Sequence, residues 1–214
     1  MGSIRSSARR TFRAHVNLGG AILLIGLLSA CTSMFFPPGA FSPGSKDISQ
    51  AEYARMQRLV AGDLDAARNE ADRFQTLGRA ARNALEDGNA EKAEMLANEL
   101  AQLAPKYAED WNYGNAIQDA NQVLGRIALA NGDVAEASRR LLASADSRGS
   151  PQLNSFGPNV LLAKELLEKG ETDVVIEYFN RCGTFWKEGK RELARWTSMV
   201  KSGKIPDFDD NISY

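Results

Sequence analysis

Apolar residues recur every three or four positions through most of the chain after residue 48. This spacing places them on one side of an α-helix, which turns once in about 3.6 residues. The clearest apolar faces are Leu64, Ala67, Ala71, Phe74, Leu77, Ala81 and Leu85; Val123, Leu124, Ile127, Ala128, Val134, Ala137 and Leu141; and Leu161, Leu162, Leu166, Val174, Val175, Tyr178 and Phe179. Valine and isoleucine are too scattered to suggest strands. The pattern therefore predicts an all-α domain.

Three short segments share one plan, in which a helix ends on a glycine and a second helix starts within a few residues. The glycines are Gly88, Gly132 and Gly170, which lie 44 and 38 residues apart. Glycine commonly ends a helix because it adopts the left-handed backbone conformation without a Cβ penalty. Repeated helical hairpins at this spacing predict a solenoid of stacked helix pairs.

The hairpins resemble the tetratricopeptide repeat (TPR) family over roughly residues 50–190. The positions that carry the resemblance are Leu77, Ala80, Ala81, Ala84, Gly88, Ala93, Ala97, Leu100 and Pro105 in a first repeat; Leu124, Gly125, Ala128, Gly132, Ala137 and Leu141 in a second; and Leu162, Ala163, Leu166, Gly170, Val175 and Phe179 in a third. The resemblance implies a TPR-like solenoid that binds a protein or peptide partner in a concave groove.

Departures from the family pattern concern the spacing and one aromatic position. The glycine joints are farther apart than the about 34 residues usual for the family, and the extra residues fall in 107–114 and 147–157. Leu77, Asn121 and Asn159 stand where the family has a tryptophan. Gly62 precedes Gly88 by only 26 residues, so residues 63–87 are expected to form one long helix.

The first thirty residues contain four arginines and no acidic residue, and their second half, residues 16–30, is an uncharged run. A basic start, a short apolar run and a small-residue exit are the parts of a secretory signal. The run is shorter than the roughly 20 residues that a membrane-spanning helix needs, although a retained anchor stays an alternative. Residues 1–30 are therefore interpreted as a signal peptide.

The exit Leu28-Ser29-Ala30-Cys31 resembles the lipobox of bacterial lipoproteins. The resemblance implies cleavage before Cys31 and a lipid on its thiol, and the alternative is a plain signal with an incidental cysteine. Thr32, rather than aspartate, favours anchoring to the periplasmic side of the outer membrane, by resemblance to the lipoprotein sorting rule. Residues 31–47 are rich in proline, glycine and serine and are expected to be a flexible tether to the domain at 48–214.

Charge and composition exclude several functions for the mature chain. The four leader arginines leave 22 basic residues against 27 acidic ones, a net charge of −5, which argues against binding nucleic acid. The only histidine, His15, lies in the leader, so no histidine triad or histidine metal site is expected. By the TPR resemblance, Cys182 falls on a packing position of the second helix and is expected to be a buried hydrophobe. No catalytic residue, metal or cofactor is expected, and the protein is predicted not to be an enzyme.

Two alternatives to partner binding remain open from the sequence. A carboxylate-dependent hydrolase would draw on adjacent acids, namely Glu86 with Asp87, Glu109 with Asp110, and Asp209 with Asp210. The second alternative is a lipoprotein that binds a small ligand. The simpler interpretation of these acidic pairs is that they are solvated side chains at helix ends or in loops.

The first helix of each hairpin carries a basic residue at an equivalent position: Arg82, Arg126 and Lys164, with Arg79 one turn before Arg82. By the TPR resemblance this helix lines the groove. The four residues, which we call the basic ladder, would then receive an acidic peptide or a terminal carboxylate. The alternative is that they form an ordinary solvated helix face.

The C-terminal part of the chain is rich in aromatic residues. A helix over 188–201 is expected, with Leu193, Trp196, Thr197 and Val200 on one face, to cap the solenoid or to serve as a partner surface. The acidic segment after Pro206 is expected to fray.

Overall fold

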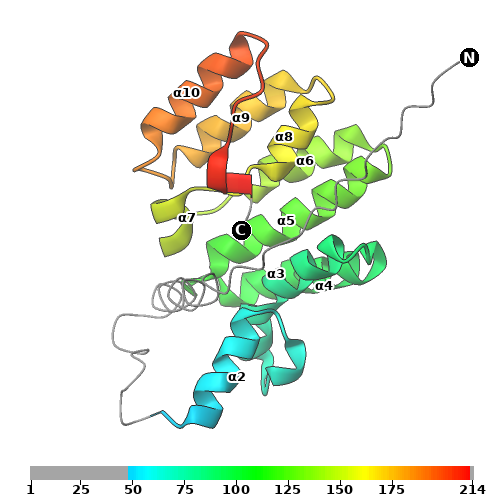
Figure 1. The fold of residues 1–214 in the computed structure, drawn as a ribbon, viewed down its shortest axis with the longest axis vertical. Coiled ribbons are helices and arrows are strands. Elements are labelled where there is room, and N and C mark those ends of the chain that lie inside the picture. The colour runs from blue at the N-terminus through cyan, green and yellow to red at the C-terminus, as the bar shows by residue number, and fades with distance from the viewer. Residues whose placement is uncertain (1–47, 213–214) are drawn as a thin grey trace, which may run out of the picture. The chain divides into compact units, whose positions relative to one another are not determined.

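The computed structural model describes residues 48–212, and this part of the chain is entirely helical, without strands, as the sequence predicted. The α-helices are α2 (Gln50–Val60), α3 (Glu70–Glu86), α4 (Ala90–Leu103), α5 (Tyr113–Ala130), α6 (Val134–Ser144), α7 (Pro151–Phe156), α8 (Leu161–Leu167), α9 (Thr172–Cys182) and α10 (Lys190–Lys201) (Figure 1). Short 3₁₀ turns are η1 (Leu64–Ala66), η2 (Ala104–Tyr107) and η3 (Asp209–Ile212). The predicted signal peptide, Cys31 and the tether lie outside the described residues.

The three predicted glycine joints are confirmed. Gly88, Gly132 and Gly170 all have positive φ, at 78°, 83° and 90°. At each joint the amide after the glycine donates back to a carbonyl in the last turn of the helix, at 2.8 to 3.0 Å: Asn89 to Ala84, Asp133 to Ala128 and Glu171 to Leu166. These bonds close the helix end and start the returning helix at once, so each joint produces an antiparallel pair.

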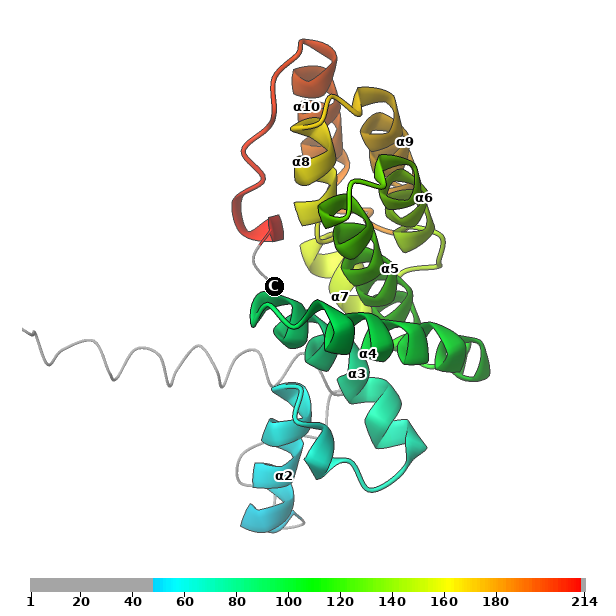
Figure 2. The ribbon, with the colours of Figure 1, turned by 90° about the vertical axis from the view of Figure 1, so that its right-hand side faces the viewer.

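The helices pack in sequence order. Helix α4 packs on α3, α5 packs on both, and α6 packs on α5. Helix α8 then contacts α5 and α6, α9 contacts α8 and α6, and α10 packs on α9 (Figures 1 and 2). One apolar cluster fills the space among α3, α4 and α5, and a second joins α6 through α10. Each pair therefore contacts the pairs next to it in the chain.

Helix α2 is attached more lightly than the others. None of its residues is buried, and Arg55 makes several of its polar contacts. The Arg55 guanidinium donates to Asp72 of α3 at 2.8 Å, to the carbonyl of Ala66 at 3.2 Å and to Glu52 of its own helix. Polar bonds therefore fix α2 where the other helices rely on buried apolar residues.

The expectation of one long helix over 63–87 is wrong. The chain there forms η1, then an extended segment, and α3 begins only after Asn69. Asn69 has an extended backbone (φ −152°, ψ 174°), and its side chain accepts the Asp72 amide at 2.8 Å. This cap satisfies an amide that would otherwise lack a partner, so the helix starts at Glu70.

The expectation that the C-terminal segment frays is also wrong for the part that the structure describes. Phe208 is 1 % exposed and packs its ring 5.1 Å from that of Trp196. The Val160 amide donates to the Asn211 carbonyl at 2.9 Å, while the Asn211 side-chain amide donates to the carbonyls of Phe156 and Pro158 at 2.9 and 3.0 Å. The acidic composition predicted solvation, but one aromatic and one amide side chain anchor the segment beside α7 and α8.

Candidate binding surfaces

The basic ladder lies on α3, α5 and α8, and two of its members are paired with acids on the first helix of the next pair. The Arg82 guanidinium of α3 pairs with Asp119 of α5, and their side chains are only 18 % and 14 % exposed. The Arg126 guanidinium of α5 pairs with Glu165 of α8 at 2.9 Å. These two ion pairs join consecutive helix pairs across largely buried contacts.

Arg79 and Lys164 are the other two residues of the basic ladder. Arg79 is half-buried, and its side-chain stem packs against the turn at Gly62. Lys164 is half-buried and makes no ion pair within residues 48–212. A ligand carboxylate at Arg82 or Arg126 would have to replace an internal carboxylate, which costs the protein its own contact. The ladder thus stays a prediction as a binding surface, and the structure gives Arg82 and Arg126 an internal role.

Glu165, the ion-pair partner of Arg126, has a shifted pKa. Burial raises the pKa of the Glu165 carboxyl above its ordinary value, and the neighbouring Arg126 guanidinium offsets the rise only in part. A carboxyl with a higher pKa in the folded state binds protons more tightly when folded. Its contribution to stability is therefore present below the unfolded pKa and is lost as pH rises through the folded pKa.

We expect the free energy of unfolding of the wild type to decline, relative to that of Glu165→Gln, as pH rises from about 4 to 7. Urea denaturation at a series of pH values measures this difference. Glu136→Gln is the matched control with the opposite sign, because hydrogen bonds from Arg139 and Arg140 lower the pKa of Glu136. The stabilising effect of Glu136 is lost as pH falls. A wild-type minus Glu165→Gln difference that does not change with pH would contradict the prediction.

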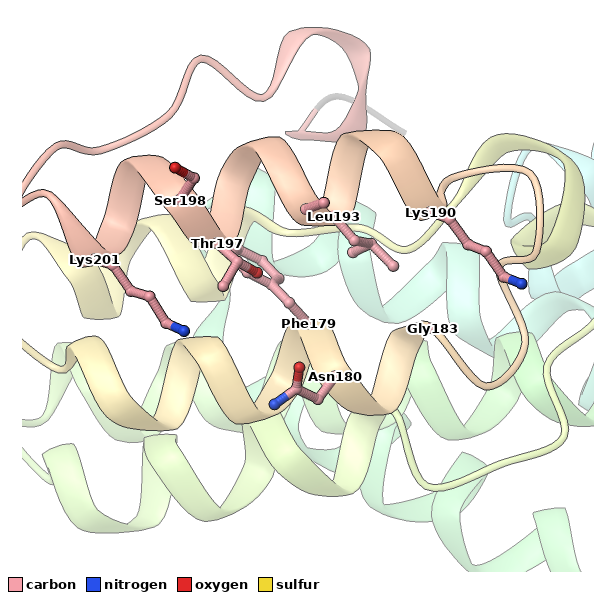
Figure 3. Close-up of a pocket in the computed structure, with 9 residues that line it drawn as sticks. Phe179, Asn180, Gly183, Lys190, Leu193, Thr197, Ser198 and Lys201 are labelled. Carbon is pink, nitrogen blue, oxygen red and sulfur yellow. The ribbon is translucent and has the colours of Figure 1, made fainter.

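A second surface is a shallow, open groove of about 540 Å³ between α9 and α10 (Figure 3). Phe179 of α9 and Leu193 of α10 lie at its apolar floor and are mostly buried, and the small residues Gly183 and Ala194 line it beside them. The remaining lining residues are polar: Asn180, Lys190, Thr197, Ser198 and Lys201. The groove therefore combines an apolar floor with hydrogen-bonding edges.

Two lysines mark the two ends of this groove. Lys190 and Lys201 stand at opposite ends of α10, and both side chains are exposed (Figure 3). Neither makes an ion pair with another residue of the described part of the chain. The nearby acids Glu177 and Glu192 are engaged by arginines of their own helices. Each end of the groove thus carries an exposed lysine.

The sequence predicts one apolar face for α10 and assigns Thr197 to it, but in the structure Thr197 lines the groove. Lys190, Ala194, Thr197 and Lys201 follow each other at intervals of four, three and four residues, which places them on one face. That face carries lysines at both ends and small or hydroxylated residues between them. The signal was present in the sequence, but only the packing of α10 on α9 shows that this face borders a groove.

The candidate chemical groups in residues 48–212 are Cys182, metal-ligating side chains and paired carboxylates. Cys182 is fully buried, as predicted, and burial raises the pKa of its thiol. No group of three His, Cys, Asp or Glu side chains in this range could hold a metal ion. Of the candidate carboxylate pairs, Glu109 is bound by Arg148 at 2.9 Å while Asp110 accepts from Gln75 at 3.0 Å, so these two carboxylates have separate partners.

Comparisons with family models, curated proteins and solved structures found no match to this chain. Among residues 48–212, no helix combines the length and the apolar character needed to cross a bilayer. The basic ladder and the α9–α10 groove are the two surfaces that bear on function.

Proposed function

We propose that this chain is a membrane-tethered, TPR-like scaffold or assembly factor that faces the periplasm and binds a protein or peptide partner. The observation that carries the proposal is the open groove between α9 and α10, with its apolar floor and its two lysines without internal ion pairs. Partner surfaces in proteins commonly combine an apolar centre with a polar rim.

The TPR-like part of the proposal is supported by repetition of the same local structure. Three antiparallel pairs, α3 with α4, α5 with α6 and α8 with α9, are each joined through a glycine with positive φ. The second helix of each pair returns at once along the first, and the next pair packs on the result. Stacked pairs of this kind present extended surfaces and serve as rigid frames for binding.

The tether and its lipid are proposed from the sequence. Cys31 follows an apolar run in a lipobox-like setting, and by the same resemblance Thr32 favours the outer membrane. The sixteen residues 32–47 could span at most roughly 55 Å if fully extended. A domain on such a tether would reach partners in the envelope while staying attached to the membrane.

Partner binding is favoured over the two alternatives by the shape and chemistry of the surface. Small ligands are usually enclosed in deep pockets, whereas this groove is shallow and open along its length. A carboxylate hydrolase needs two acids that flank one scissile bond, and the carboxylates of the candidate pair Glu109 and Asp110 are held by separate partners. A long, open and charged groove suits a segment of another protein.

Photocrosslinking inside cells tests the proposal. A photoreactive amino acid is placed at Ala194 in the groove, at Lys164 on the ladder, and at exposed Ala135 of α6 as the matched control. We expect a discrete adduct of higher mass from Ala194, with none from Ala135, because only a bound partner stays close enough to react. Absence of an adduct from every surface position of the full-length, membrane-bound protein would contradict the proposed function. An adduct from Lys164 alone would move the site to the ladder.

A further inference from the structure

The α9–α10 groove occupies the place where the packing order of the chain calls for another helix. Helix α9, the second of its pair, packs on its own partner α8 and on α6, the second helix of the preceding pair. By the same order, the helix after α10 would pack on α10 and on α9. The groove is formed by these two helices, so it is the vacant position of a second helix for the last pair.

The chain does not fill this position with its own C-terminal segment. After α10, the described residues turn back towards α7 and α8, where Asn211 bonds to the carbonyls of Phe156 and Pro158 (Figure 2). The Phe208 side chain is buried and packs against the rings of Trp196 and Phe179. The described residues after α10 therefore pack beside α7 and α8 and leave the groove open.

The floor of the groove fits a helix better than an extended strand. Gly183 and Ala194 are small, which allows the axis of a third helix to approach α9 and α10 closely. Phe179 and Leu193 offer limited apolar contact because both are already mostly buried. The apolar contribution to binding is consequently modest, and the charges at the ends must add to it.

The two lysines at the ends of the groove favour an occupant with acidic residues. Lys190 and Lys201 are eleven residues apart on α10, which is roughly 16 Å along a helix axis. A helix lying alongside α10 would match them with two carboxylates about three turns apart. Lysine ammonium groups without internal partners attract such carboxylates, and the attraction weakens with salt.

We propose that the α9–α10 groove receives an amphipathic helix of a partner protein, with small apolar side chains on one face and acidic residues about three turns apart. The partner helix completes the last helix pair of the stack. This inference rests on the proposed function and specifies its partner, since the proposed function itself requires only that some surface binds a protein.

The test uses the full-length lipidated protein in detergent micelles and a designed, fluorescently labelled helical peptide of about 15 residues. The acidic probe carries an alanine- and leucine-rich face and two glutamates eleven positions apart, and the matched probe has lysines in place of the glutamates. Fluorescence anisotropy measures binding of each probe. We expect the acidic probe to bind and the lysine probe to bind at least about tenfold more weakly, because like charges repel.

Three variants locate the binding. Lys190→Glu/Lys201→Glu is expected to weaken the acidic probe at least about tenfold, and Ala194→Trp is expected to block it by filling the groove. Arg191→Glu is the matched control, because it reverses a charge on an exposed part of α10 that does not line the groove. It is expected to change binding by less than about threefold. Circular dichroism checks that each variant is folded, which the exposure of all four positions favours.

Several outcomes would overturn the inference. Equal binding of both probes would show an apolar surface without preference for acids. Failure of the acidic probe to bind at millimolar concentration would show that the groove takes no such helix, even where photocrosslinking finds a partner on another surface. Dissociation of an oligomer by Ala194→Trp, measured by sedimentation, would identify a second copy of this chain as the occupant. The last two results leave the proposed function standing, so the two failures are distinguishable.

Discussion

Replacement of Cys31 by alanine is expected to move the protein from the membrane fraction to the soluble fraction of the envelope. The lipobox resemblance implies three acyl chains on this residue, and each buried CH₂ contributes about 0.8 kcal/mol to membrane attachment. A single chain anchors only marginally, so three would make release negligible. In addition, no helix among residues 48–212 could replace the lipid as a membrane span. Fractionation by ultracentrifugation, with incorporation of a clickable palmitate analogue, measures both attachment and acylation.

Cys182→Ala is the matched control for this experiment. Cys182 is fully buried, so its removal should leave both attachment and palmitate labelling unchanged. Labelling that persists in Cys31→Ala would contradict the proposed lipid site. Membrane attachment without labelling, together with the mass of the uncleaved chain, would instead indicate a retained N-terminal anchor.

Trp196→Ala is expected to lower the free energy of unfolding by about 3–5 kcal/mol, the range for truncating a fully buried aromatic side chain. Trp196 is 1 % exposed and packs against three other rings. The ring centroids of Phe179 and Trp186 lie 5.6 Å away, and that of Phe208 lies 5.1 Å away. Loss of the indole would leave a cavity where α9, α10 and the C-terminal segment meet. Urea denaturation followed by circular dichroism measures the change.

Trp196→Phe provides the matched control. The indole Nε1–H has no hydrogen-bond partner among the described residues, so phenylalanine loses volume there without losing a hydrogen bond. Its cost is expected to be clearly smaller than that of Trp196→Ala. A loss below about 1 kcal/mol for the alanine variant would show that the rings are not the centre of this cluster.

The helices were predictable because their determinants are local. Apolar periodicity identifies a helix face wherever one side is buried, and the glycine joints at Gly88, Gly132 and Gly170 announce helix ends through backbone sterics alone. Cys182 could be assigned to the core for the same reason, since its position falls on the apolar face of its helix. Features of this kind depend on a few neighbouring residues.

Features that depend on tertiary contact were not predictable. The basic ladder is the clearest case, because the sequence shows the arginines in register but not that Asp119 and Glu165, each on the first helix of the next pair, reach them. Trp186 is another, since it fits against Gly157 and Gly189, where a Cβ at either glycine would overlap its ring. The docking of Phe208 likewise depends on rings that are brought together only by folding.

The light attachment of α2 has a mechanical consequence. Any pull transmitted from the chain before Gln50 reaches α2 first, and α2 contributes no buried residue to the core. The Arg55 bonds to Asp72 and to the Ala66 carbonyl would therefore break under load before the apolar clusters beyond them are strained. Helix α2 would detach first under such a load, and the chain would lengthen while the helices from α3 onward remain folded.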